Sequence, residues 1–268
     1  MLLQQSQVAL IAPPGHLWTR DSVDFSEGRY RVKLASGPLE VESALRLRYE
    51  VFRVESSEAP PPEDPSRLEF DEYDFACRHL IVIDRLTSRT VGTYRLAAIE
   101  SVGGVEGFYS YNEFSIEDLP MDVLRNGVEI GRACIASEHR NSRVLFLLWK
   151  GLSAFLRDER KRFFFGCCSI FTRDESVGAM AFARLAGNGN LHETLRVTPR
   201  KNAVDLTFAS DAAVELPNLF NMYLRIGAKV CGPPMVDHEF GTIDFFVVCD
   251  TERISERHRR MFFGETKN

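Results

Sequence analysis

The stretch VEIGRACI, Val128 to Ile135, carries a carboxylate and a guanidinium in a segment that otherwise looks like a buried strand. Glu129 can accept a proton from an amine, and Arg132 can pair with an anion, so both are candidate catalytic residues. Residues three apart in a regular strand point to opposite faces. A bulge at Gly131 would return both side chains to one face and would free backbone N–H groups for a ligand. The alternative is a buried ion pair that only fixes the strand register.

Further polar residues lie in segments that we expect to be buried, and they are candidate substrate-binding residues. Arg48 and Phe52 are four residues apart in an apolar helical stretch, so they lie one turn apart on one helix face. Asp71 and Asp74 follow in FDEYD, and Arg95 lies in the strand-like GTYRL. Each has a simpler explanation: the two aspartates can cap a turn, and the first arginine can extend along the helix surface to solvent.

The composition is typical of one ordinary globular domain, with 268 residues of which 44% are hydrophobic and 26% charged. The net charge of −5 argues against a nucleic-acid partner, which usually requires a basic domain. The six cysteines form no C-x-x-C pair and no zinc pattern with histidine, so we expect reduced thiols and no metal. The N-terminus lacks an early basic region and is broken by Pro13 and Pro14, so it is a poor signal peptide. We expect a cytoplasmic protein and leave peripheral contact with the membrane open.

Hydrophobic periodicity predicts alternating strands and helices. The expected strands are 29–35, 77–84, 90–99, 128–135, 162–171 and 242–250, and the expected helices are 38–55, 144–161, 176–187 and one that begins near 215 and stops at Gly227. The short polar link after residue 84 predicts an antiparallel hairpin. The fold class is therefore α/β (α+β), with a mixed, mostly antiparallel central sheet and helices on both faces. We place an N-terminal arm at 1–28, one folded domain at 29–250 and a C-terminal tail at 251–268.

A set of short motifs resembles the GNAT acyltransferase superfamily. Within it, the chain looks like the ornithine-lipid-type N-acyltransferases and the long-chain N-acyl amino acid synthases. The motifs are LRYEVF, FDEYDFACRHLIVID, VGTYRL, GFYSYNEF, EIGRACI, LWKGL, FGCCS, YLRIGAKVCGPP and FGTIDF, and they extend in order from about Tyr30 to Asp250. The resemblance implies a GNAT-like sheet with one splayed strand.

A more distant resemblance is to the acyl-homoserine-lactone synthases. That family has an arginine and a phenylalanine on its first helix, then two acids, then an arginine on a strand, then Glu-x-x-Arg on the splayed strand. The residues of this chain in those places are Arg48, Phe52, Asp71, Asp74, Arg95, Glu129 and Arg132. The family also has a tryptophan before the acid pair, and this chain has none between residues 52 and 71. That departure argues against lactone formation, which stays as an alternative function.

The resemblance implies that a long-chain acyl group, 3-hydroxylated in some relatives, moves from the 4'-phosphopantetheine thioester of acyl carrier protein to the α-amine of an amino acid. Ornithine is the first expected acceptor. No permanently bound cofactor is needed. The implied roles are proton acceptor for Glu129, thioester binding by the N–H groups of Ala133, Cys134 and Ile135, and binding of a cationic acceptor by Asp71 or Asp74.

The loop ASEHRNSRV after the central strand has no glycine, whereas many superfamily members bind the coenzyme A pyrophosphate with a glycine-rich turn there. A carrier protein presents a single phosphodiester, which Arg140 and Arg143 can contact. A plain acetyltransferase would need pyrophosphate donors that the sequence lacks. A non-catalytic acyl-binding module on the same fold is the remaining alternative.

Overall fold

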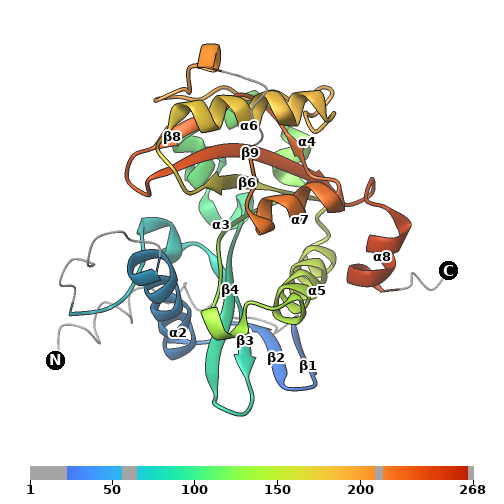
Figure 1. The fold of residues 1–268 in the computed structure, drawn as a ribbon. Coiled ribbons are helices and arrows are strands. Elements are labelled where there is room, and N and C mark those ends of the chain that lie inside the picture. Colours follow the sequence, from blue (N-terminus) through green and yellow to red (C-terminus); the bar gives the residue numbers. More distant parts are fainter. Residues whose placement is uncertain (1–22, 56–64, 209–213, 265–268) are drawn as a thin grey trace. The chain divides into compact units, whose positions relative to one another are not determined.

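The computed structural model describes residues 23–55, 65–208 and 214–264. Most of the predicted N-terminal arm and the proline-rich stretch 56–64 lie outside the described residues. The chain forms two compact units (Figure 1). The first contains residues 1–101, 130–160 and 262–266, and the second contains 102–129, 161–261 and 267–268. Strand β5 (Gly127–Ile135) contributes residues to both units.

The first unit is an antiparallel sheet with a helix on each face (Figure 1). Its strands are β1 (Asp24–Glu27), β2 (Tyr30–Leu34), β3 (Arg78–Asp84) and β4 (Arg89–Ala98), hydrogen-bonded in that order, and its helices are α2 (Pro38–Tyr49) and α5 (Ser142–Asp158). On β3, Ile81 packs in a cluster with Leu45 of α2. The preceding residue, Leu80, faces α5. Its two methyl groups lie so close to Gly151 that a Cβ atom added to this glycine would be 2.9 Å from them. Burial on both faces explains why β3 is a continuous apolar run.

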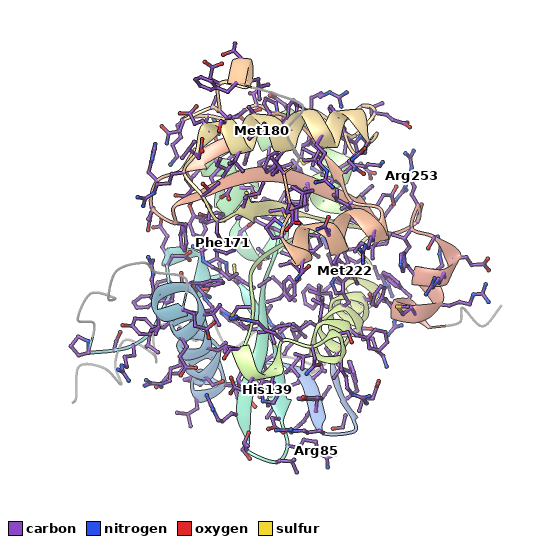
Figure 2. All side chains as sticks on the ribbon, in the orientation of Figure 1. Arg85, His139, Phe171, Met180, Met222 and Arg253 are labelled. Carbon is purple, nitrogen blue, oxygen red and sulfur yellow. The ribbon has the colours of Figure 1, made fainter. Side chains whose placement is uncertain are left out.

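Helix α2 ends earlier than the sequence pattern predicts. Pro38 occupies the first turn, as expected for its fixed φ. After Tyr49 the chain continues as a π-helix, η2 (Glu50–Glu55). The expected α-helix therefore changes to a π-helix before Phe52, and a shared face for Arg48 and Phe52 stays a prediction. Figure 2 shows the side chains of this unit, with Arg85 at the turn between β3 and β4.

The second unit is built around two long antiparallel strands, β6 (Phe163–Ile170) and β9 (Thr242–Asp250). Two short strands, β7 (Lys229–Val230) and β8 (Met235–Asp237), also pair with β9. One face of β9 carries Ile243 and Phe245, which pack against helices α6 (Glu175–Gly187) and α7 (Asn218–Ile226). The opposite face carries Phe246, whose ring lies 5.9 Å from that of Phe114. Two more short helices, α3 (Ile99–Val102) and α4 (Met121–Arg125), lie on the chain before β5, and α8 (Glu256–Phe263) follows β9.

Strand β5 changes partner along its length. Its first three residues pair in parallel with β6, from Gly127 opposite Phe163 to Glu129 opposite Phe165. Further along, Ala136 donates its N–H to the carbonyl of Val91 in β4 (2.9 Å). The left-handed residue in this strand is Arg132, with φ +49°, whereas Gly131 has ordinary φ. The strained backbone conformation is that of Arg132, directly after Gly131, and a bulge at Gly131 stays a prediction.

The predicted fold class is confirmed: the nine strands found among the described residues form a mixed, mostly antiparallel sheet system. The predicted β3–β4 hairpin and the predicted strand over β9 are confirmed as well. The pattern missed β1, β7, β8 and α8, which are short. The described helices include none that combines the length and the apolar character needed to cross a membrane.

Candidate functional site

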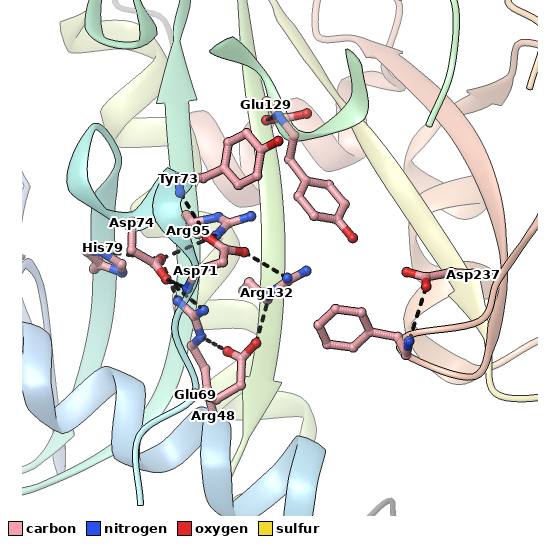
Figure 3. Close-up of polar contacts among 12 residues, drawn as sticks. Arg48, Glu69, Asp71, Tyr73, Asp74, His79, Arg95, Glu129, Arg132 and Asp237 are labelled. Carbon is pink, nitrogen blue, oxygen red and sulfur yellow. Dashed lines mark hydrogen bonds and ion pairs between the residues drawn. The ribbon is translucent and has the colours of Figure 1, made fainter. Parts of the chain in front are cut away.

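Three guanidinium groups and three carboxylates form a buried network in the first unit (Figure 3). At its centre is Arg48 of α2, which is 1% exposed. Its two terminal nitrogens donate to the two oxygens of Asp74 at 2.7 and 3.0 Å. Its Nε donates to Glu69 at 2.5 Å. The explanation of Arg48 as a surface side chain is therefore wrong, because both its partners lie in the interior.

Arg95 of β4 and Arg132 of β5 complete the network. Arg132 Nη2 donates to Asp71 Oδ2 at 2.8 Å, and its Nε lies 3.3 Å from Glu69. Arg95 Nη1 donates to Asp71 Oδ1 at 2.5 Å and to Asp74 at 3.4 Å. Three positive charges thus meet three negative charges, as burial of so many ions requires. Glu69, one residue before the quoted FDEYD motif, was missed, although it is an acid next to an apolar run.

Asp71 and Asp74 also form a capping box on the 3-10 helix η3 (Glu72–Phe75). Asp71 accepts from the N–H of Tyr73 at 3.0 Å, and Asp74 accepts from the N–H of Asp71 at 2.9 Å. The simpler explanation of these acids as capping residues is therefore confirmed. Their oxygens accept hydrogen bonds from arginine side chains and from backbone N–H groups within the chain.

Burial and charge fix the protonation of this network. Burial alone would raise the pKa of Asp74, but the positive charges of Arg48 and Arg95 outweigh it and hold that pKa well below the ordinary value. Burial lowers the pKa of the adjacent His79 to about 4, against the opposing effect of Asp74. At neutral pH the carboxylate is therefore charged and the imidazole neutral. The network is suited to holding η3, α2 and β5 in position rather than to moving protons.

The residues predicted to contact the donor lie at the C-terminal end of β5 and in the turn after it. Ala133 and Ile135 are half-buried and Cys134 is buried, and their N–H groups stay a predicted thioester site. Arg140 is exposed, and its Nε donates to the carbonyl of Ile135 at 3.0 Å while its terminal nitrogen pairs with Glu55.

The start of α5 is already capped within the chain. The side chain of Asn141 accepts from the N–H groups of Arg143 and Val144 at 3.0 and 3.2 Å. Arg143 is exposed, and its guanidinium lies 3.5 Å from Glu27. Two N–H groups that would otherwise face an anion are therefore bonded to a side chain. A role of Arg140 or Arg143 in donor binding stays a prediction.

Glu129 belongs to the second unit, where a short helix holds its carboxylate. Glu129 is 7% exposed, and its carboxylate lies at the start of the 3-10 helix η5 (Tyr109–Asn112). The N–H of Tyr109 donates to Oε2 at 3.0 Å, and the N–H of Ser110 donates to Oε1 at 2.8 Å. One backbone donor on each oxygen fixes the plane of the carboxylate.

A second group of acids lies in the same unit and was not predicted from the sequence. The Ser110 hydroxyl lies 3.5 Å from the Cys167 thiol, which donates to Glu113 Oε2 at 2.9 Å. Glu113, Asp237 and Asp244 are all buried, and each offers a carboxylate oxygen within 4.8 Å of the others. Two of these acids stand in the quoted motifs GFYSYNEF and FGTIDF, so an acid within an apolar run was the available signal.

The protonation of Glu113 predicts how stability depends on pH. Burial, followed by the negative charge of Asp244, raises the pKa of Glu113 from 4.5 to about 8. The folded state therefore binds this proton more tightly than the unfolded state, and the stability gained is complete below the unfolded value and is lost as pH rises through about 8. Between pH 4.5 and about pH 8, ionisation of Glu113 lowers the free energy of unfolding by up to about 1.4 kcal/mol per pH unit.

Urea unfolding at several pH values tests this expectation, with Glu113→Gln as the variant. Glutamine cannot ionise, so the variant should not share the loss of stability caused by ionisation of Glu113. From pH 5.5 to pH 8.5, the unfolding free energy of wild type should therefore fall relative to that of the variant. Subtracting the two curves removes the titration of other groups, such as His79 and Asp74. Parallel curves across this range would contradict a protonated Glu113 in the folded protein.

Comparison with known proteins identifies the family. Residues 47–150 match the model of the acetyltransferase (GNAT) domain. The chain is 33% identical over 265 residues to an L-ornithine N(alpha)-acyltransferase of Brucella abortus (strain 2308), covering 89% of this chain and 90% of that protein.

Solved structures with similar folds include FeeM, an N-acyl amino acid synthase from uncultured soil microbes, with a TM-score of 0.49 and 7% identity over 85% of this chain and 95% of that one. They also include BjaI, a CoA-dependent acyl-homoserine lactone synthase, with a TM-score of 0.47 and 14% identity over 82% of this chain and 81% of that one. The resemblance drawn from the sequence motifs is confirmed by the family model and by the sequence relative. The chain belongs to the L-ornithine N(alpha)-acyltransferase family and is an acyltransferase with a GNAT domain.

Proposed function

We propose that this acyltransferase forms an amide between a long-chain fatty acyl group and the α-amine of ornithine. The observation that carries the proposal is the similarity, over 89% of the chain, to a protein named L-ornithine N(alpha)-acyltransferase. The held carboxylate of Glu129 supports it, since acylation of an amine needs a group that takes its proton.

The acceptor half of the reaction uses Glu129. An amino acid enters with its α-amine as an ammonium group, which cannot attack a carbonyl. Glu129 accepts one proton, directly or through a water molecule, and the amine then attacks the thioester carbon. The two N–H bonds from Tyr109 and Ser110 keep the carboxylate oriented while its charge is neutralised and restored.

The donor half uses an acyl thioester on the 4'-phosphopantetheine of acyl carrier protein. Attack by the amine gives a tetrahedral oxyanion, which the N–H groups of Ala133, Cys134 and Ile135 stabilise. Collapse of the intermediate forms the amide and breaks the C–S bond. The second proton lost by the nitrogen passes to the thiolate, which leaves as a thiol, and Glu129 releases its proton to solvent. Arg140 and Arg143 bind the phosphodiester or the acidic carrier. A direct part for Arg132, and a 3-hydroxyl group on the acyl chain, belong to the same proposal.

The place of the reaction follows from its product. An N-acyl amino acid with a long chain is an amphiphile that partitions into a bilayer. We place the enzyme in the cytoplasm, where acyl carrier protein is found, with peripheral contact to the membrane when the product leaves.

Incubation of the purified protein with 3-hydroxyacyl carrier protein and single amino acids tests the function. We expect mass spectrometry to detect N-acyl-ornithine, formed in a one-to-one ratio with released carrier thiol. The matched reactions contain the same acyl group on coenzyme A, or no amino acid. Thiol release without an amide, or equal amides from all amino acids, would overturn the proposal, and a homoserine lactone product from S-adenosylmethionine would favour the alternative.

A further inference from the structure

The buried acids Glu113, Asp237 and Asp244 have surroundings unlike those of the arginine network. Glu113 follows η5, Asp237 ends β8, and Asp244 lies in β9. They are 4%, 8% and 3% exposed, and their carboxylate oxygens lie within 4.8 Å of one another. Acids this close and this buried repel each other unless one of them takes up a proton, as the raised pKa of Glu113 indicates, or a cation joins them. We name these three residues the acid cluster.

The partners of two of these acids are neutral groups. Glu113 accepts from the thiol of Cys167 at 2.9 Å and is hydrogen-bonded by the side chain of Tyr109. Asp237 Oδ1 accepts from the N–H groups of Glu239 and Phe240 at 2.8 and 3.1 Å. In the first unit, by contrast, each of the three acids has a guanidinium partner. The described partners of Glu113 and Asp237 therefore carry no charge that would neutralise these two acids.

Thr242 supplies a second, independent sign of a ligand. It is 3% exposed, lies opposite Asp237 in the β8–β9 ladder and is two residues before Asp244. Side chains alternate along a strand, so Thr242, Asp237 and Asp244 share one face of this hairpin. Within the part of the chain that the structure describes, its buried Oγ1 has no hydrogen-bond partner. A buried hydroxyl without a partner is costly, and a ligand that fills the cluster would satisfy it.

The geometry favours an ammonium group as that ligand. A primary ammonium has three N–H donors and no acceptor, which matches three carboxylates. A hard divalent cation also binds carboxylates and completes its coordination with water molecules, so Ca²⁺ and Mg²⁺ are competing ligands that the test below includes. The thiol of Cys167, which donates to Glu113, is also a soft group of a kind that such cations do not favour.

The acid cluster and Glu129 are connected through a single short helix. Ser110 of η5 donates its N–H to Glu129 at 2.8 Å, and its hydroxyl contacts Cys167, which donates to Glu113. All of these residues belong to the second unit. The two nitrogen atoms of an extended ornithine are about 6 Å apart by standard bond lengths. In the inferred arrangement, a diamino acid presents one nitrogen to Glu129 and the other to the cluster.

We propose that the acid cluster, with Thr242, binds the side-chain ammonium group of the acceptor and so selects α,ω-diamino acids. This inference rests on the proposed function, in which Glu129 accepts the proton of the α-amine. The arginine network then serves to hold the first unit together, and the acceptor's second charge is recognised in the second unit.

The test compares ornithine with norleucine, which replaces the side-chain ammonium by a methyl group of similar size. We expect wild type to use ornithine at least about 100-fold better in kcat/KM, because losing a charged hydrogen-bond partner leaves the buried acids unpaired. Asp244→Asn should lower kcat/KM for ornithine by about 10-fold or more and leave the norleucine value within about threefold. Thr242→Val should lower the ornithine value less, because it removes one neutral hydroxyl. Glu117→Gln, at an exposed acid paired with Arg200, is the matched control and should leave the ratio unchanged.

Binding without the acyl donor separates the two proposals. We expect 1,4-diaminobutane and ornithine to raise the Tm of wild type, and this shift to be lost in Asp244→Asn and reduced in Thr242→Val. An unchanged ornithine-to-norleucine ratio in both variants would overturn the inference. Stabilisation of wild type by Ca²⁺ or Mg²⁺ without any by ornithine would also overturn it, in favour of a metal site. If wild type acylates no amino acid but keeps the Asp244-dependent shift, the proposed function fails while the ammonium site stands.

Discussion

Replacing Arg48 with methionine is expected to lower the free energy of unfolding by about 3–5 kcal/mol, the usual result of removing one partner from a buried ion pair. The methionine fills much of the space, but Glu69 and Asp74 then remain 4% and 0% exposed without their main cation. Each must either stay charged in the interior or take up a proton. Such a loss is a large part of the stability of an ordinary domain.

Urea unfolding of the Arg48→Met protein measures this loss. Arg46→Met is the matched control, because Arg46 lies on the same helix, is about half exposed and pairs with Glu42 one turn away. An exposed pair of that kind contributes about 0.5 kcal/mol or less. Arg48→Lys should fall between the two, because lysine keeps the charge but cannot make the forked contact with Asp74.

The pH dependence distinguishes charge burial from lost packing. In wild type, Arg48 and Arg95 hold the pKa of Asp74 well below its ordinary value despite burial, so the stability from this group is present above pH 3.8 and is lost as pH falls further. In the variant, the buried acids gain stability from protonation as pH falls. The gap between wild type and Arg48→Met should therefore narrow on acidification. A gap that stays constant down to acid pH would mean that the loss comes from packing alone.

Replacing Glu129 with glutamine is expected to lower kcat by about 100-fold or more, the range measured for positioned acid–base groups. Glutamine has nearly the same shape, but it cannot accept a proton from an ammonium group. Its amide nitrogen would also face one of the N–H donors of Tyr109 and Ser110. Donor binding should change little, because the acyl thioester meets other groups in the proposed mechanism.

The readouts for Glu129→Gln separate catalysis from positioning. Steady-state kinetics should show a fall in kcat that is much larger than any change in the affinity for acyl carrier protein. The dependence of kcat/KM on pH should lose its acidic limb, which reports a group that must be deprotonated. Glu117→Gln serves again as the control acid in the same unit. Equal losses in turnover and donor affinity, with an unchanged pH profile, would assign Glu129 a positioning role.

Several elements were readable from local pattern because each is long enough for its period to show. The 17-residue α5 has a clear apolar stripe, and β9 is a nine-residue run that the pattern bounds correctly. The two-residue β7 and the three-residue β8 are too short to show any period. Their position is set by pairing with β9, which is a tertiary contact.

The candidate site was readable only in part. The motif comparison pointed to Arg48, Asp74 and Glu129, and the structure puts the first two in direct contact. Glu69 and the acid cluster were not predicted because the groups that each acid contacts lie far away in the sequence. Glu113 and Asp244 are more than a hundred residues apart, and only the folding of the second unit brings their oxygens together.

The family, the order of the main helices and strands, and the presence of polar residues such as Glu129 in buried segments could be predicted from the amino-acid sequence. Those properties depend on the period of apolar residues and on short motifs, both of which are local. The tertiary structure decided which charges meet, which are neutralised and which are left to attract a ligand. Charge interactions depend on distance in space and on exclusion of water, and neither is set until the strands are paired.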